Sequence, residues 1–343
     1  MEIKTRVLPA DEAGVAEAAQ LLRQGQLVAL PTETVYGIAA DARNGAAVRN
    51  IFVAKGRPQD NPLIVHVTGP EMLPGLVSEV PERAQLLMAA FCPGPLTIIM
   101  PRGPEVADEC CAGLDTVGIR MPSHPVARAV IAQSGCAFAA PSANLSGKPS
   151  PTTAEHVRQD MDGRVDLIID GGPCKYGLES TVVSLIGRPT ILRPGAVTKE
   201  MLEAVIGPVD VAHAVLSPLR EGETAASPGM KYRHYAPDAE VVVAEGKERE
   251  IAAKICREYD AREAAGEDCI IFATKQTQPF YRGRNCVIIG DRTEPATLCA
   301  SLFYSLREYG GRADVIFAEA LPNDDMGLAY MNRLLRSAGF NII

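Results

Sequence analysis

The sequence predicts an α/β protein built from two domains, and three observations lead to this prediction. The chain has 343 residues, which is more than a single hydrophobic core usually holds. Residues 1–210 alternate short β-rich runs with helical patterns, and residues 239–343 follow the order β-α-β-β-α-β-α. Between them, residues 211–238 lack clean periodicity and contain prolines and glycines, which is typical of a linker.

The alternating runs of residues 1–210 predict a sheet surrounded by helices. The expected strands are Leu27–Pro31, Leu63–Val67, Leu96–Met100, Val117–Met121, Ala137–Ala140, Leu167–Asp170, Thr181–Leu185 and Ile191–Arg193. The expected helices are Val15–Arg23, Ala46–Ala54, Glu82–Phe91, Pro125–Gln133, Ala154–Met161 and Lys199–Ile206. Because several strands follow one another without a helix between them, we expect a mixed sheet and not a regular doubly wound one.

Residues 239–343 predict a small parallel α/β domain. The expected strands are Glu240–Val243, Ile270–Ala273, Val287–Ile289 and Val315–Ala318, with helices near 248–264, 295–309 and 325–337. This part of the chain contains neither G-x-G-x-x-G nor a Walker sequence, so nucleotide binding is not predicted there.

The composition, 47% hydrophobic and 22% charged, is that of a globular protein. A formal net charge of −8 argues against a protein that coats nucleic acid nonspecifically, although it allows a local basic pocket. The N-terminus lacks the apolar core of a signal peptide, and no apolar run is long enough to span a membrane, so we expect a cytoplasmic protein. The nine cysteines form no C-x-x-C pair, which favours reduced, buried thiols over a zinc site. The adjacent Cys110 and Cys111 are the one candidate pair for redox chemistry.

Polar residues follow the expected strands and helices at several points. Thr32–Gly37 has the hydroxyls, carboxylate and glycine of a ligand-facing turn, and it also fits an ordinary turn with threonine caps. Lys55-Gly56-Arg57-Pro58 ends an expected helix. Its cations fit a polyphosphate, with Gly56 allowing close approach of the backbone, or else the dipole of a helix C-terminus.

Arg120 stands inside an otherwise apolar strand. A buried arginine is costly unless it meets an anion, so its partner is either an internal carboxylate or the carboxylate of a ligand. Pro141–Gly147 offers hydroxyl, amide and backbone donors that suit a phosphate or carbonyl group. Gly177–Val183 and Ile191–Gly195 also place polar residues at the ends of expected strands. No nucleophile or metal-binding spacing is evident, which favours catalysis by positioning and charge stabilisation in one polar site.

Taken together, these residues resemble the threonylcarbamoyl-AMP synthase family, whose catalytic module is the YrdC-like domain. The matching stretches are Pro31–Gly37, Lys55–Pro58, Asn61–His66, Pro93–Thr97, Val117–Pro122, Pro141–Gly147, Glu179–Val183 and Leu192–Gly195. The resemblance continues through Ser227–Pro237 and the C-terminal domain. It implies a YrdC-like twisted mixed sheet with helices around a concave, basic cavity in residues 1–210, and a smaller Rossmann-like parallel α/β domain in residues 239–343.

The resemblance also implies an activity. The enzyme would combine L-threonine, bicarbonate and ATP, with Mg²⁺, into threonylcarbamoyl-adenylate and release pyrophosphate. A partner threonylcarbamoyltransferase would then modify the adenosine beside the anticodon of tRNAs that read ANN codons. Lys55, Arg57 and Arg120 are the residues expected to act in catalysis, and no protein residue is assigned as a metal ligand.

The binding residues follow from the same resemblance. The threonine site is expected to contain Thr34, His66, Arg120, Ala140 and Ser180. The ATP site is expected to contain Lys55, Arg57, Thr116, Ser142, Asn144, Arg193, Tyr232, His234 and Tyr235. The last three belong to the linker 211–238, which is expected either to cover the cavity as a lid that excludes water or merely to pack between the domains.

Two other functions remain open at this point. A non-catalytic RNA-binding or ribosome-associated module would fit a basic cavity and weak RNA binding, but it is disfavoured by the acidic net charge and by the lack of an RNA-stacking motif. A carbamoyl-transfer protein of hydrogenase maturation would share the YrdC-like module. Such proteins add an acylphosphatase-like part and cysteine zinc motifs, which this sequence lacks.

Overall fold

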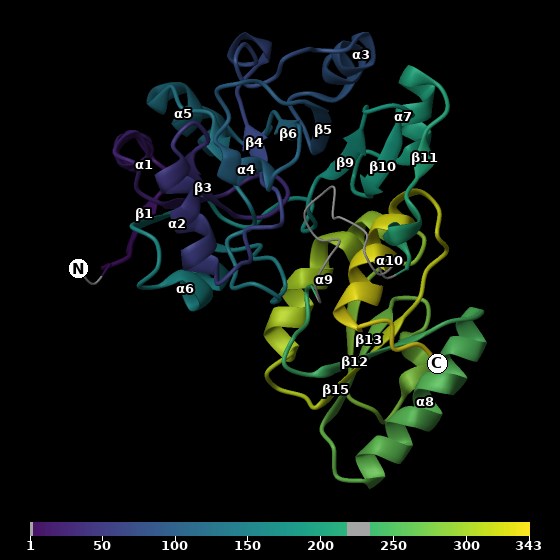
Figure 1. Cartoon of the computed structure of the whole chain (residues 1–343). Helices are drawn as coiled ribbons and strands as arrows, with labels where there is room; N and C mark the ends of the chain where they lie inside the picture. Colours follow the sequence, from purple (N-terminus) through teal and green to yellow (C-terminus); the bar gives the residue numbers. More distant parts are fainter. Residues whose placement is uncertain (1–2, 218–233) are drawn as a thin grey trace. The chain divides into compact units, whose positions relative to one another are not determined.

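The computed structural model describes residues 3–217 and 234–343 of the chain. These residues form two compact units. The first contains residues 3–146 and 150–217, and the second contains residues 147–149 and 234–343 (Figure 1). A short piece of the N-terminal sequence thus belongs to the second unit.

The first unit continues past residue 210, the predicted end of the first domain. Residue 210 begins the strand β11 (Asp210–Val211), and β11 pairs in parallel with β10 (Thr190–Arg193) of the same unit. The short helix η2 (His213–Val215) follows it. The pairing with β10 therefore holds this segment in the sheet of the first unit.

The first unit is built on one mixed sheet. Within the described part of the chain it has eleven strands, in the order β1-β8-β2-β3-β7-β4-β6-β5-β9-β10-β11 (Figure 1). Some neighbours run parallel, such as β4 and β6, and others antiparallel, such as β5 and β6, so the mixed sheet predicted from the sequence is confirmed. The other strands and their bounds are β1 (Arg6–Pro9), β2 (Val28–Leu30), β3 (Gly37–Asp41), β4 (Ile64–His66), β5 (Leu96–Pro101), β6 (Thr116–Arg120), β7 (Phe138–Ala139), β8 (Leu167–Asp170) and β9 (Thr181–Ser184).

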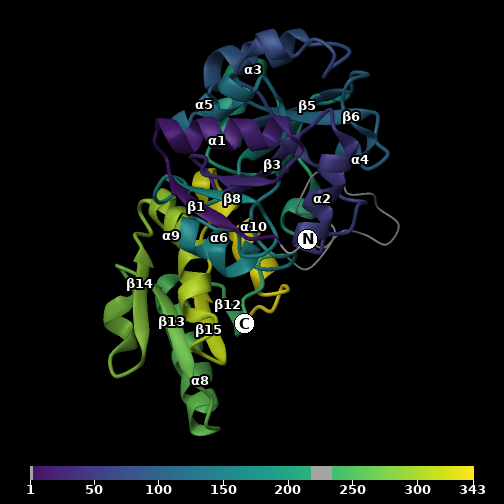
Figure 2. The same cartoon turned by 90° about the vertical axis from the view of Figure 1, so that its left-hand side faces the viewer.

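Helices pack on both faces of this sheet. On one face, α1 and α5 lie side by side over β2, β3 and β8 (Figures 1 and 2), and their core includes Val28, Phe138 and Leu167. On the opposite face, Val65 and Ile119 join the core that includes residues of α2, α3, α6 and α7. The helices of this unit are α1 (Glu12–Arg23), α2 (Gly45–Lys55), η1 (Pro70–Met72), α3 (Glu82–Phe91), α4 (Asp108–Cys111), α5 (Pro125–Ser134), α6 (Ala154–Met161) and α7 (Lys199–Ile206).

The second unit has a separate parallel sheet, as predicted. Its strands lie in the order β12-β15-β13-β14, and each neighbouring pair is parallel. Residues 147–149 join this unit through their main chain, because Gly147 O accepts from Ala236 N and Pro149 O accepts from the Arg307 side chain. The elements are β12 (Glu240–Ala244), α8 (Glu248–Ala264), β13 (Cys269–Thr274), η3 (Gln278–Tyr281), β14 (Cys286–Gly290), α9 (Pro295–Tyr309), β15 (Val315–Glu319) and α10 (Asp325–Ser337).

Several short elements of the first unit were not expected from the sequence, among them β1, β3 and α4. β1 is a four-residue strand at the edge of the sheet, and α4 is a single helical turn. β3 has the sequence Gly-Ile-Ala-Ala-Asp, which lacks the aromatic residues that usually signal a strand and has one β-branched residue. None of the helices formed by residues 3–217 and 234–343 is long and apolar enough to cross a membrane.

Candidate active site

A row of side chains crosses five neighbouring strands of the first unit. His66 of β4 lies opposite Arg120 of β6, and Arg120 lies opposite Thr97 of β5. Thr97 in turn lies opposite Val182 of β9, which lies opposite Arg193 of β10. Residues directly opposite one another share a face of the sheet. The row therefore brings together three residues predicted to bind substrates, from segments far apart in the sequence.

Arg120 forms a buried ion pair. Its Nη2 donates to Glu33 Oε1 at 2.8 Å, and the side chains of the two residues are 5% and 6% exposed. The other carboxylate oxygen of Glu33 accepts from Ser123 N at 3.2 Å. Burial raises the pKa of Glu33, but the charge and the hydrogen bond of Arg120 outweigh burial and hold that pKa below its ordinary value. An internal carboxylate, one of the two partners left open by the sequence, is thus present.

The guanidinium of Arg120 still has donors to spare. Its Nε is buried and has no hydrogen-bond partner among the described residues. Its Nη1 lies 3.5 Å from His66 Nε2, the outer limit of a hydrogen bond. An unpaired buried donor costs free energy, so it is expected to find a partner in the working protein. A ligand carboxylate is therefore compatible with Arg120 even though Glu33 is present.

His66 is a neutral hydrogen-bond acceptor in this site. Burial, and then the nearby charge of Arg120, lower its pKa to about 3. Nδ1 lies 3.2 Å from the carbonyl oxygen of Ile64, and a carbonyl oxygen can only accept, so the ring hydrogen belongs on Nδ1. The lone pair of Nε2 then faces the guanidinium.

Hydroxyl groups connect the two ends of the row. Thr97 Oγ1 lies 2.8 Å from Ser180 Oγ. Arg193 donates from Nη2 to Ser180 Oγ at 3.1 Å and from Nε to Ser180 O at 3.0 Å. On the other side, Thr34 Oγ1 lies 2.8 Å from Thr32 Oγ1, next to Glu33 in the sequence. Ser180, expected at threonine, and Arg193, expected at ATP, are thus in direct contact.

Lys55 is the last residue of α2, and its ammonium points to a loop. Gly56 caps the helix in the left-handed conformation, at φ 60°, which glycine adopts without strain. Lys55 Nζ donates to the main-chain carbonyl oxygen of Ser142 and, at 2.6 Å, to that of Asn144. Ser142 Oγ donates to Asn144 Oδ1 at 2.5 Å. The structure therefore brings these three predicted ATP residues together.

The remaining predicted residues of the first unit have the following contacts. Arg57 Nη2 lies 3.4 Å from the carbonyl oxygens of Asn61 and Pro62. Ala140 follows β7 and donates its N–H to the carbonyl oxygen of Ile64 at 2.9 Å. Thr116 begins β6 and lines a small cavity together with Thr97 and Ile64.

The linker residues have different positions. Tyr232 lies outside the described residues. His234 and Tyr235 belong to the second unit, where the Tyr235 ring packs 4.9 Å from that of Phe303 and 5.6 Å from that of His234. Tyr235 is buried and has a φ of 63°, which is uncommon for a tyrosine.

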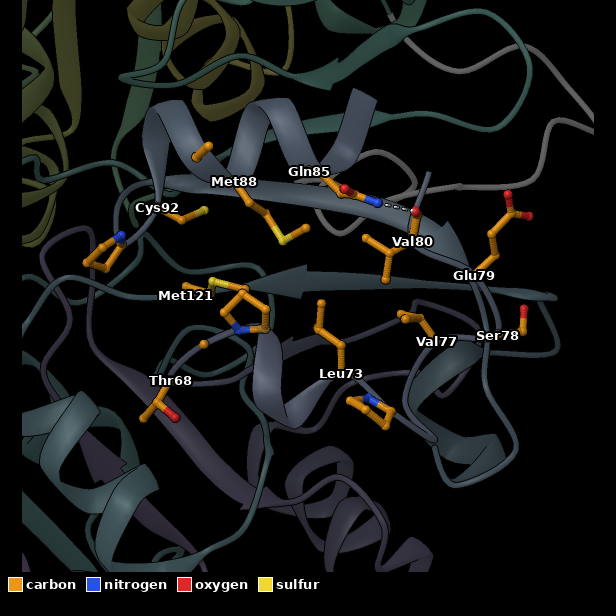
Figure 3. A pocket seen from close by; sticks show the side chains of 15 residues that line it. Thr68, Leu73, Val77, Ser78, Glu79, Val80, Gln85, Met88, Cys92 and Met121 are labelled. Atoms are coloured by element: carbon orange, nitrogen blue, oxygen red, sulfur yellow. Dashed lines mark hydrogen bonds between the residues drawn. The ribbon is translucent and has the colours of Figure 1, made fainter. Parts of the chain in front are cut away.

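A second pocket of the first unit has a different chemistry. It measures about 660 Å³ and lies between α3 and the end of β6 (Figure 3). Met88, Met121 and Val80 point into it, together with Leu73 and Val77 (Figure 3). Met121 follows Arg120 directly, so the alternation of side chains along a strand turns it to the opposite face of the sheet. This apolar lining does not suit phosphates or a zwitterion.

The cysteines offer no reactive site. Every cysteine is a free thiol, and both Cys110 and Cys111 are buried. Burial raises the pKa of both thiols, that of Cys111 to about 11. Thiolates are the reactive species, so the structure gives no support to redox chemistry at this pair.

Comparison with known proteins covers the whole chain. A family model described as "Telomere recombination" matches residues 20–195, and one described as "Threonylcarbamoyl-AMP synthase, C-terminal domain" matches residues 197–339. The threonylcarbamoyl-AMP synthase of Bacillus subtilis (strain 168) is 46% identical over 342 residues, which cover 99% of this chain and 97% of that protein. The enzyme of the same name from Pyrococcus abyssi is 43% identical over 335 residues, which cover 97% of this chain and 96% of that protein.

A solved structure agrees with these matches. The crystal structure of P. abyssi Sua5 complexed with L-threonine has a TM-score of 0.92 and 42% sequence identity, and the match covers 100% of this chain and 99% of that chain. The predicted fold class, a large mixed sheet with helices plus a smaller parallel α/β sheet, is therefore confirmed. The chain belongs to the threonylcarbamoyl-AMP synthase family of enzymes.

Proposed function

We propose that this protein joins L-threonine, bicarbonate and ATP into L-threonylcarbamoyl-AMP and releases pyrophosphate. The observation that carries the proposal is the buried Arg120, whose Nε has no partner among the described residues although Glu33 engages Nη2. A guanidinium with spare donors in a buried polar row suits the carboxylate of an amino acid. The complex of the P. abyssi relative with L-threonine supports threonine as that amino acid.

Threonine would lie at the His66 end of the row. Arg120 would bind its carboxylate. The neutral His66, with an acceptor lone pair on Nε2, is suited to a donor such as the amino or hydroxyl group of threonine. Thr34, Ala140 and Ser180 complete the proposed threonine site.

ATP would lie toward the loop held by Lys55. Lys55, Arg57 and Arg193 supply positive charge for the phosphates, and Ser142 and Asn144 supply polar groups. Thr116, Tyr232, His234 and Tyr235 are further proposed contacts of the nucleotide. We propose that the segment carrying the three aromatic residues excludes water from the labile product.

The chemistry needs no covalent intermediate with the enzyme. The threonine amine attacks the carbon of bicarbonate, water leaves, and a carbamate forms. A carbamate oxygen then attacks the α-phosphorus of ATP, and the bond to pyrophosphate breaks. Each step brings anions together, so cationic side chains in a low-dielectric site lower the barrier by charge stabilisation.

Magnesium would arrive with ATP in this proposal. The described residues contain no group of three or more His, Cys, Asp or Glu that could hold a metal. Mg²⁺ commonly keeps several waters and binds substrate phosphates with only one or two carboxylates, which fits such a site. We propose that a cytoplasmic tRNA threonylcarbamoyltransferase consumes the product.

The test is an assay with ATP, radiolabelled bicarbonate and L-threonine. We expect pyrophosphate release and labelled threonylcarbamoyl-AMP that both require threonine, with serine or no amino acid as controls. Pyrophosphate release that does not depend on threonine would contradict the proposal, as would folded protein that releases none.

A further inference from the structure

We propose that Glu33 is a positioning residue that orients Arg120 toward the carboxylate of the amino-acid substrate. This inference rests on the function proposed above and adds a residue that the threonine site, as predicted from the sequence, does not contain. It follows from the hydrogen bonds of Glu33, from the donors that it leaves open on Arg120, and from the charge of the pair.

The Glu33 carboxylate is held firmly from both sides. One oxygen accepts from Arg120 Nη2 at 2.8 Å and the other from Ser123 N at 3.2 Å. The main chain of Glu33 is held as well, since its carbonyl oxygen accepts from Tyr176 N at 2.9 Å. With side chains 5% and 6% exposed, the pair of Arg120 and Glu33 is shielded from water that could compete for its hydrogen bonds.

The contact with Glu33 determines which N–H donors of Arg120 remain available to a ligand. A guanidinium has five N–H donors in one plane. Fixing Nη2 against Glu33 fixes the rotation of that plane, with Nη1 toward His66 and Nε without a partner among the described residues. Without Glu33, the plane could turn so that other donors meet Thr32 Oγ1, which already lies 3.5 Å from Nη2.

The charge of the pair has a further effect. Arg120 with Glu33 is neutral overall, so the protein can hold the arginine in the interior before a ligand arrives. The substrate carboxylate then meets an arginine that is already oriented. Such preorganisation lowers the cost of binding. Because Glu33 acts through Arg120, replacing Glu33 should raise KM for threonine and leave KM for ATP largely unchanged.

The experiment compares Glu33→Ala and Glu33→Gln with the wild-type protein. We expect Glu33→Ala to raise KM for threonine at least tenfold while KM for ATP changes less than twofold. Glu33→Gln should restore part of the threonine KM, because its amide oxygen can still accept from Nη2 in the same volume although its NH2 group cannot accept from Ser123 N. The matched control is Glu319→Gln, a buried carboxylate of the second unit bonded to Tyr281 and Arg292, which should leave both KM values within twofold.

The role of Glu33 is overturned if folded Glu33→Ala keeps the wild-type KM for threonine, or if both KM values rise equally. If circular dichroism shows that Glu33→Ala is unfolded, the same KM measurements are made on Glu33→Asp. Its shorter side chain cannot reach both Nη2 and Ser123 N, so we expect KM for threonine to rise at least threefold while KM for ATP does not change. An unchanged KM for threonine would overturn the proposal. If the wild-type protein itself makes no threonylcarbamoyl-AMP, the proposed function fails, which is a result distinct from an active enzyme that is indifferent to Glu33.

Discussion

The side-chain nitrogen of Lys55 lies 2.6 Å from the main-chain carbonyl oxygen of Asn144, and it also donates to that of Ser142. Lys55 is only 2% exposed. The first cation of the Lys-Gly-Arg-Pro run thus stabilises the loop that carries two proposed ATP residues. The ammonium has three donors, and each donor given to a carbonyl oxygen of the loop is one fewer for a phosphate.

Replacing Lys55 by methionine should destabilise this loop. The change leaves buried carbonyl oxygens without their donor, which should lower the free energy of unfolding by about 1–3 kcal/mol. KM for ATP should rise as well. Urea unfolding and steady-state kinetics measure the two effects. Lys199→Met, at a half-buried lysine paired with Glu203, serves as the control and should stay within about 0.5 kcal/mol of the wild type. Equal stabilities of the two variants would contradict the structural role of Lys55.

Replacing Arg120 by methionine should have two consequences. It leaves the Glu33 carboxylate buried without its cation. Breaking a buried ion pair in this way typically lowers the free energy of unfolding by about 3–5 kcal/mol. It should also abolish threonine-dependent pyrophosphate release while ATP binding, measured by calorimetry, largely remains. Loss of ATP binding in a folded variant would argue against a role specific to threonine.

The double variant Glu33→Gln with Arg120→Met separates stability from function. Both charges are then removed with little change in volume, and such replacements are often close to neutral. We expect chemical denaturation to show most of the lost stability restored, with threonine use still absent. A double variant as unstable as Arg120→Met would mean that the stranded charge is not the cause.

His66 should make stability depend on pH in the acid range. Burial, and then the charge of Arg120, lower its pKa to about 3, against about 6.5 in an unfolded chain. Above pH 6.5 both states are neutral, so His66 has no effect there. Between about pH 6.5 and 3 the unfolded chain binds a proton that the folded protein does not, so stability falls with decreasing pH by up to about 1.4 kcal/mol per unit.

Urea unfolding at pH 7.0 and 5.5 checks this dependence. His66→Gln should lose less stability than the wild type over that interval, whereas His213→Gln, at an exposed position, should follow the wild type. Parallel curves for the wild type and His66→Gln would show that His66 is not the titrating group.

Cys110 and Cys111 should resist alkylation in the folded protein. Both are buried and burial raises the pKa of each thiol, so the thiolate is scarce at pH 7.5. Mass spectrometry after treatment with iodoacetamide should find neither residue modified, and urea-denatured protein should be modified at both. Rapid labelling of the native pair would refute this prediction.

Much of the fold could be predicted from local patterns. The bounds predicted for α3, α6 and α7 match the structure, because apolar spacing defines the helices and Thr153 and Thr198 cap the last two. β3 was missed because its Gly-Ile-Ala-Ala-Asp sequence is weakly β-prone, and it is a strand because it pairs with β2 and β7.

The site was less accessible to sequence reasoning. A lone arginine in an apolar strand signals an anion, but the residue that supplies it, Glu33, is 87 positions away. In the sequence, Glu33 is distinguished only by its position between two threonines after a buried strand. That pattern does not indicate which cation pairs with its carboxylate. Likewise, the alignment of His66, Arg120 and Thr97 is a matter of register between strands, which depends on the whole sheet.

Residues 147–149 bear on how the two domains can be separated. They begin three positions after Asn144, and their carbonyl oxygens accept from Ala236 and Arg307 of the C-terminal sequence. A chain cut after residue 210 would remove both donors. The cut would then change the hydrogen bonding of residues 147–149 in addition to deleting the second unit. The activity of such a shortened chain would therefore report the loss of these hydrogen bonds together with the loss of the second unit.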